Sequence, residues 1–128
     1  MIAPTYLLDT NSCIYLIART HPSLNQAVGR RRPGVVAISA IVYPELAMGL
    51  EKLGEEGDRL LANFIGAIPV VSFDETAARA YARVPFRRGK LDRLIAAHAL
   101  GLDAILITNN EGDFADVPGL KVENWVRE

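Results

Sequence analysis

The feature that most constrains the fold is a series of short, wholly apolar segments spaced along the chain. They lie at residues 6–8, 35–38, 70–71 and 104–107, with a last one around Val122. A continuous apolar run is typical of a strand buried on both faces, whereas a strand with one wet face alternates. The segments between them carry apolar residues at helical spacing. The pattern predicts an α/β fold, with a mainly parallel sheet between two layers of helices.

Helices are expected at residues 23–28, 39–54, 56–65, 74–84 and 90–100, besides one that contains Ile14 and Ile17. Ser39 is predicted to cap the helix that carries Glu45. With that cap, Pro44 lies beyond the positions where a missing N–H is harmless, so we expect a kink or a tight first turn. Gly101 is predicted to end the helix at 90–100.

Length and composition limit the possible functions. The 128 residues fit one domain, and half of them are hydrophobic, which is enough for a packed core. The formal net charge of −1 provides no basic field to hold a polyanion, so any affinity for nucleic acid must come from local patches or bound metal. A single cysteine excludes an internal disulfide. With no secretory signal and no membrane span apparent, we expect a cytoplasmic protein.

Two acidic residues are predicted to lie at one edge of the sheet. Asp9 directly follows the first strand, and the turn at residues 108–110 leads from a late strand to Asp113. Ligands of open α/β sheets bind beyond the carboxyl ends of the strands. Glu45 and Asp92 lie near the starts of helices that can open toward the same edge.

Each acid also has a purely structural interpretation. Asp9 can simply cap the next helix, and Asp92 can interact with a helix dipole. Glu45 can be a surface residue, and Asp113 a loop residue with Asp116 as a nearby competitor. The joint placement of the four acids favours a functional site over four separate structural roles.

A cluster of carboxylates implies a metal. Crowded negative charges repel one another and do not all stay ionised without compensation. A divalent cation supplies that compensation, and an all-oxygen ligand set favours Mg²⁺ or Mn²⁺ over zinc. Two such ions about 4 Å apart can activate a water and stabilise the leaving oxygen in phosphodiester cleavage.

Four sequence blocks resemble the motifs of PIN-domain nucleases. They are LLDTN at 7–11, PEL at 44–46, DRLIAAHA at 92–99 and TNNEGDF at 108–114. Within that family the chain looks most like VapC toxins of bacterial toxin–antitoxin pairs, and VPGL at 117–120 and ENW at 123–125 extend the likeness. The resemblance spans residues 1–128 as a single PIN domain, and it implies a Rossmann-like, three-layer α/β/α fold.

The resemblance also implies an activity: Mg²⁺- or Mn²⁺-dependent endonucleolytic cleavage of single-stranded RNA, often tRNA. By position, the metal-binding and catalytic acids would be Asp9, Glu45, Asp92 and Asp113, with Asp9 and Asp92 as principal ligands. Supporting polar residues would be Asn11 and, further along the chain, Thr108 and Asn110.

The partners follow from the same resemblance. VapC-type proteins are toxins of type II systems, usually homodimeric and held inactive by a cognate VapB antitoxin. The complex would be a heterotetramer or larger, and operator DNA would be contacted only through the antitoxin. No membrane partner is implied.

The chain departs from the family pattern before Asp92. The stretch at residues 74–92 is several residues shorter than usual, with a compact join at 85–89. Arg87, Arg88 and Lys90 in this region are candidates to contact RNA phosphates or the antitoxin. Their alternative interpretation, like that of the basic run at 30–32, is solvated loop charge.

Other interpretations stay open from sequence alone. His98 could be a general base, although a packing histidine is the better expectation. Asp9 could be the phosphoacceptor of a receiver-like domain. A non-catalytic PIN-like module could use its acidic pocket only to dock a basic partner.

Overall fold

The computed structural model describes residues 3–88 and 90–127, and within them the strands form one parallel sheet. The strand order is β3-β2-β1-β4-β5. Each neighbouring pair is parallel, so the predicted sheet is confirmed. The strands are β1 (Tyr6–Leu8), β2 (Val36–Ser39), β3 (Val70–Val71), β4 (Ile105–Ile107) and β5 (Lys121–Glu123).

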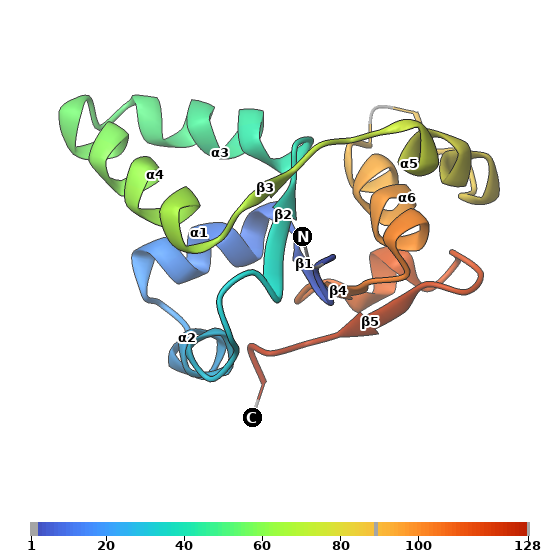
Figure 1. The fold of residues 1–128 in the computed structure, drawn as a ribbon, viewed down its shortest axis with the longest axis horizontal. Helices are drawn as coiled ribbons and strands as arrows, with labels where there is room; N and C mark the ends of the chain where they lie inside the picture. The colour runs from blue at the N-terminus through green and yellow to red at the C-terminus, as the bar shows by residue number, and fades with distance from the viewer. Residues whose placement is uncertain (1–2, 89, 128) are drawn as a thin grey trace.

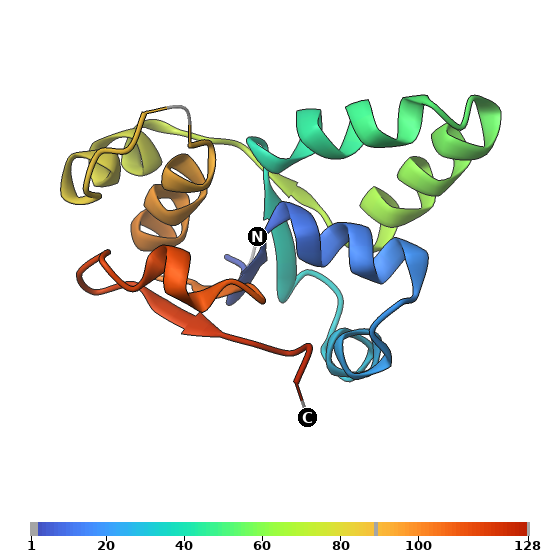
Figure 2. The same cartoon turned by 180° about the vertical axis from the view of Figure 1, so that it is seen from behind.

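Helices cover both faces of the sheet, as the apolar strands require. Figure 1 and, from behind, Figure 2 show α1 to α4 on one side of the central strands and α5 and α6 on the other. The helices are α1 (Thr10–Ala18), α2 (Pro22–Gly29), α3 (Val42–Glu51), α4 (Glu55–Ala67), α5 (Glu75–Ala80) and α6 (Asp92–Leu102). Two short 3₁₀ helices complete the fold, η1 (Tyr81–Arg83) and η2 (Glu111–Phe114).

The core lies on the central strands and the helix faces that cover them. Leu8 of β1, Ile38 of β2 and Leu106 of β4 have no exposed surface. Burial of such side chains from water is the main favourable contribution to folding. It also explains why these strands are apolar throughout.

The strand order places a crevice where the predicted acids are expected. From β1 the chain moves outward through β2 and β3, then returns to the other side of β1 with β4. In open α/β sheets, ligands bind at such a reversal, outside the carboxyl ends of the strands. The backbone N–H of Asp9 donates to the carbonyl of Ile107 over 3.1 Å, which joins the two strand ends directly.

The start of α3 differs from the prediction. The helix begins at Val42, and Ser39 belongs to β2, where its hydroxyl accepts a hydrogen bond from the N–H of Ile41. Pro44 is therefore the third residue of α3 and lies in the first turn. Because the first four N–H groups of a helix have no partner within it, the missing donor costs little and needs no kink.

The end of α6 was also predicted wrongly. Gly101 lies inside the helix, and Asp103 takes the left-handed conformation that ends it, with φ of 55°. Gly101 instead packs closely against α5, since a Cβ there would lie 3.1 Å from the Cα of Ala77. The prediction confused a packing glycine with a capping one.

Smaller differences concern element ends. The helix predicted at 74–84 is divided into α5 and η1, and Asp74 caps α5. The helix predicted from Lys90 begins at Asp92, while Gly89 of the compact join lies outside the described residues. In the described ranges, none of the helices has the length and apolar character needed to cross a membrane.

Candidate active site

A cavity of about 340 Å³ lies at the carboxyl edge of the sheet, and all four predicted acids line it. They come from four separate parts of the chain: the end of β1, the first turns of α3 and α6, and η2. The lining consists of Asp9, Thr10, Asn11, Glu45, Lys90, Leu91, Asp92, Ile95, Asn110, Asp113 and Phe114. The fold thus brings together carboxylates that the strand-edge argument expects to meet.

Asp9 is both a helix cap and a wall of the cavity. Its Oδ1 accepts a hydrogen bond from the N–H of Ser12 at 2.8 Å, so the capping interpretation is correct. The side chain is largely buried, at 7% exposure. Capping occupies Oδ1, and the hydrogen bonds described leave Oδ2 without a partner from the cap.

Glu45 lies in the first turn of α3 and is half-buried. Its Oε1 accepts a hydrogen bond from the hydroxyl of Thr10 at 2.7 Å. This contact ties the start of α3 to the start of α1, immediately beside Asp9. Glu45 thus lies at the cavity, with part of its surface exposed.

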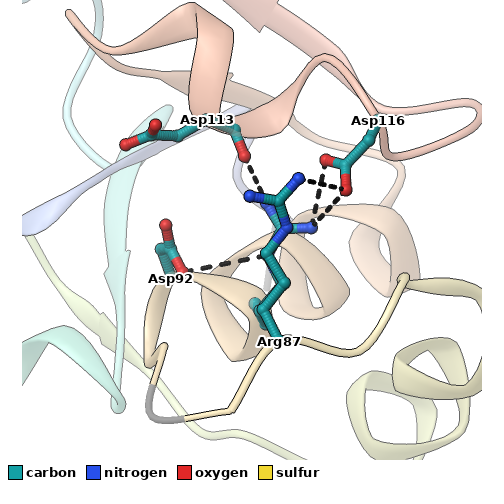
Figure 3. Close-up of polar contacts among 5 residues, drawn as sticks. Arg87, Asp92, Asp113 and Asp116 are labelled. Atoms are coloured by element: carbon teal, nitrogen blue, oxygen red, sulfur yellow. Dashed lines mark hydrogen bonds and ion pairs between the residues drawn. The ribbon is translucent and has the colours of Figure 1, made fainter.

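Asp92 and Asp113 both line the cavity. Asp92 opens α6, and its Oδ1 is buried without a hydrogen-bond partner among the described residues. Asp113 lies in η2 and is exposed. In Figure 3 the carboxylate of Asp113 points away from Asp116 and toward the side where Asp92 lies.

Asp116 has a different role from Asp113. Its carboxylate accepts hydrogen bonds from Arg93 and Arg87, each at 3.1 Å. Burial raises the pKa of Asp116, but the hydrogen bond and charge of Arg93, with the charge of Arg87, outweigh it and hold the pKa below the ordinary value. Asp116 is thus engaged with arginines and does not line the cavity.

Sequence reasoning missed Arg93. Its side chain is only 1% exposed, although it follows Asp92 directly. Helical spacing could have predicted its burial, because Arg93 lies on the same helix face as the buried residues Ala96 and Ala97, three and four positions further on. The apolar residues of this helix begin at Leu94, so the charged residue directly before them was not expected to be buried.

The predicted supporting residues divide into two groups. Asn11, Asn110 and Lys90 line the cavity. Thr108 does not line it; its buried hydroxyl accepts the N–H of Asn110 at 3.0 Å and shapes the turn. Arg87 and Arg88 are exposed and lie outside the lining.

His98 is a packing residue, as expected. It is 1% exposed, its Nδ1 lies 2.6 Å from the hydroxyl of Ser39, and its ring contacts Phe73 edge-on. Burial lowers its pKa, although the charge of Asp74 opposes the shift. A neutral, enclosed imidazole outside the cavity is not placed to act on a substrate.

The donor set fits a hard divalent cation. Carboxylate and amide oxygens line the cavity, and the buried Oδ1 of Asp92 has no hydrogen-bond partner in the described ranges. Within residues 3–88 and 90–127, no three side chains of His, Cys, Asp or Glu stand close enough to form a ready-made metal cage. Mg²⁺ does not require one, because it usually binds through one or two carboxylates and keeps several waters.

Comparison with known proteins shows to which protein family the chain belongs. Residues 6–120 match the model of the PIN domain. The chain belongs to the PIN domain family, as its four sequence blocks predict.

Within the family it groups with the VapC ribonucleases. Ribonuclease VapC2 of Rickettsia felis is 33% identical over 94% of this chain and 97% of the relative. The tRNA(fMet)-specific endonuclease VapC of Shigella flexneri is 32% identical over the same shares. The structure of DNA-bound VapBC from Salmonella typhimurium superposes with a TM-score of 0.81 at 29% identity, covering 95% of this chain and 98% of that one.

Proposed function

We propose that this chain is the toxin of a type II toxin–antitoxin system and acts as an endoribonuclease on single-stranded RNA. The observation that carries the proposal is the gathering of Asp9, Glu45, Asp92 and Asp113 on one cavity. The similarity to VapC ribonucleases supports the same activity. It does not favour a receiver-like phosphoacceptor or a docking module without catalysis.

Asp9 and Asp92 are the principal metal ligands in this proposal. Mg²⁺ or Mn²⁺ bound there would lower the pKa of an attacking water and stabilise the leaving oxygen. Glu45, held by the Thr10 hydroxyl, and Asp113, on η2, enclose the same space and can hold metal-bound waters. Asn11 and Asn110 supply neutral hydrogen-bonding groups at the rim.

The charges of the cavity also bear on the substrate. Among the described residues that line it, Lys90 is the one cation beside four acids. An acidic cavity repels an RNA phosphate unless metal compensates its charge. In this proposal Lys90 contacts a substrate phosphate. A tRNA is the proposed substrate, because two relatives are named as tRNA(fMet)-specific endonucleases.

Cleavage of a synthetic single-stranded RNA by the purified chain tests this activity. With Mg²⁺ or Mn²⁺ we expect cleavage by the unaltered chain, and a loss of at least about 10²-fold in Asp92→Asn or after addition of EDTA. An equal rate in Asp92→Asn, with folding intact, would refute the assignment.

A VapB-type antitoxin is the proposed inhibitor. An apolar hollow of about 400 Å³ lies between α3 and α4, lined in part by Pro44, Met48 and Leu61. Met48 is 69% exposed on this hollow and adds to its apolar surface. An amphipathic helix of an antitoxin suits such a groove. Co-purification with the product of a small adjacent gene, lost in Met48→Glu, tests this partner.

The assembly belongs to the same proposal. The chain would form a homodimer, and a heterotetramer or larger complex with the antitoxin, in the cytoplasm. Contact with operator DNA would run through the antitoxin, and solved VapBC relatives include complexes bound to DNA. Light scattering of the chain alone and of the complex measures both assembly states.

A further inference from the structure

Arg93 is the most unusual residue beside the cavity. It is among the largest fully buried side chains of the described chain, with 1% of its surface exposed. Burial of a guanidinium is costly unless the charge is paired and hydrogen-bonded. Because Arg93 directly follows Asp92, its burial points to a role at the candidate active site.

The guanidinium contacts three aspartates at once. Nη1 donates to both carboxylate oxygens of Asp116, at 3.1 and 3.3 Å, and Nη2 donates to the backbone carbonyl of Asp113. Nε lies 3.8 Å from Oδ1 of Asp92, too far for a hydrogen bond but within ion-pair range. The group also lies over the ring of Phe114, with its carbon 5.9 Å from the ring centroid.

These contacts join two elements that carry acids of the cavity. Arg93 belongs to the first turn of α6, beside Asp92, whereas η2 carries Asp113 twenty residues further on. Two side-chain contacts run directly from α6 to η2: the hydrogen bond from Arg93 to the Asp113 carbonyl and the contact of the same guanidinium with the Phe114 ring. A planar fork with fixed donor directions can set both orientation and distance.

We infer that Arg93 is a positioning residue, which fixes the Asp113 carboxylate relative to that of Asp92 and thereby sets the affinity of the cavity for a divalent cation. The inference rests on the proposed function, because it assumes that these acids bind metal. Partners that orient metal ligands typically account for about 10- to 100-fold in metal affinity. A residue that only stabilises the fold would change the unfolding temperature and leave the affinity of the folded protein unaltered.

Calorimetric titration of the full chain with Mn²⁺ tests the inference. In Arg93→Gln we expect Kd to rise at least about 10-fold, measured below the unfolding temperature. Arg93→Lys keeps the charge but not the fork, so we expect it to weaken binding as well. Arg79→Gln removes an exposed arginine of α5 that pairs with Glu75, and as a matched control it should bind Mn²⁺ like the unaltered chain.

A double-mutant cycle shows whether Arg93 acts through Asp113. In an Asp113→Ala background the carboxylate to be positioned is absent, so Arg93→Gln should weaken Mn²⁺ binding by less than about 2-fold. An equal loss in both backgrounds would overturn the inference, and so would full affinity in Arg93→Lys. If Arg93→Gln does not fold, Arg93→Lys carries both tests.

The outcomes separate the two proposals. Tight Mn²⁺ binding by the unaltered chain together with unaltered affinity in both Arg93 variants overturns the positioning role alone. No Mn²⁺ binding by the unaltered chain overturns the metal site, and the positioning role with it.

Discussion

At the scale of single residues, Asp9 is both a helix cap and a residue of the candidate site. One carboxylate oxygen caps α1 by accepting the N–H of Ser12, and the residue also lines the cavity. The two interpretations that the sequence leaves open are therefore compatible. Stability and activity can be separated by replacing one carboxylate oxygen.

The substitutions Asp9→Asn and Asp9→Ala test this division. Asparagine caps a helix about as well as aspartate, so Asp9→Asn should unfold with a free energy within about 0.5 kcal/mol of the unaltered chain. Asp9→Ala should lose about 1 kcal/mol with the cap. Both should lose RNA cleavage. Urea unfolding and a cleavage assay on the same samples measure the two effects, and an active Asp9→Asn would contradict the role in catalysis.

His98 should make stability depend on pH. Burial lowers its pKa in the folded chain below the value of 6.5 that it has in the unfolded chain. As the pH falls through that value, the unfolded state takes up a proton that the folded state refuses, so the free energy of unfolding decreases. Above it, both states are neutral and this contribution is fully present.

Urea unfolding at about pH 7.5 and about pH 5.5 measures this effect. The unaltered chain should lose more stability between the two values than His98→Gln, which has no imidazole to protonate. All other ionisable groups are common to both proteins. The same loss in both would show that His98 does not control this pH range.

The sequence could predict which residues lie at the cavity where those residues directly follow a strand. Asp9 and Asp113 were expected at the cavity because parallel strands share their carboxyl edge. The buried fork of Arg93 was not, since its partners, the Asp113 carbonyl and the Asp116 carboxylate, lie about twenty residues away and meet it only in three dimensions.

At the scale of elements, the sequence predicted the identity of helices and strands better than their ends. Gly101 illustrates the reason. A glycine near the end of an apolar helix is typical of a C-cap, yet here Asp103 adopts the left-handed conformation. The close approach of α5 to α6 decides the role of Gly101, and sequence periodicity carries no information on that distance.

Two glycine substitutions at matched helix positions test this explanation. Gly101 and Gly66 are the second-to-last residues of α6 and α4. In Gly101→Ala the new Cβ would lie 3.1 Å from backbone atoms of α5, so overpacking should destabilise the chain by about 1–3 kcal/mol. The higher helix propensity of alanine should offset about 1 kcal/mol of that loss. Gly66 has open space and should gain up to about 1 kcal/mol as alanine.

The unfolding temperatures of both variants provide the measurement. Gly101→Ala should fall below the unaltered chain and Gly66→Ala should match or exceed it. A stabilised Gly101→Ala would mean that α5 and α6 can move apart at little cost, against the close packing described above.

At the scale of the whole molecule, strand order creates the site. The reversal between β1 and β4 opens a crevice at the carboxyl edge, and α3 and α6 each start there with an acid in the first turn. Apolar runs predicted the parallel sheet, but not on which side of β1 each later strand lies. That order depends on packing between segments far apart in the chain.

The central claim is that Asp9 and Asp92 bind a divalent cation in this cavity. Anomalous diffraction from crystals grown with Mn²⁺ measures it most directly. We predict an anomalous peak inside the cavity, about 2.0–2.6 Å from carboxylate oxygens of both residues, and its absence in Asp92→Asn. A peak only at other surfaces, or none in the cavity at saturating Mn²⁺, would contradict the claim.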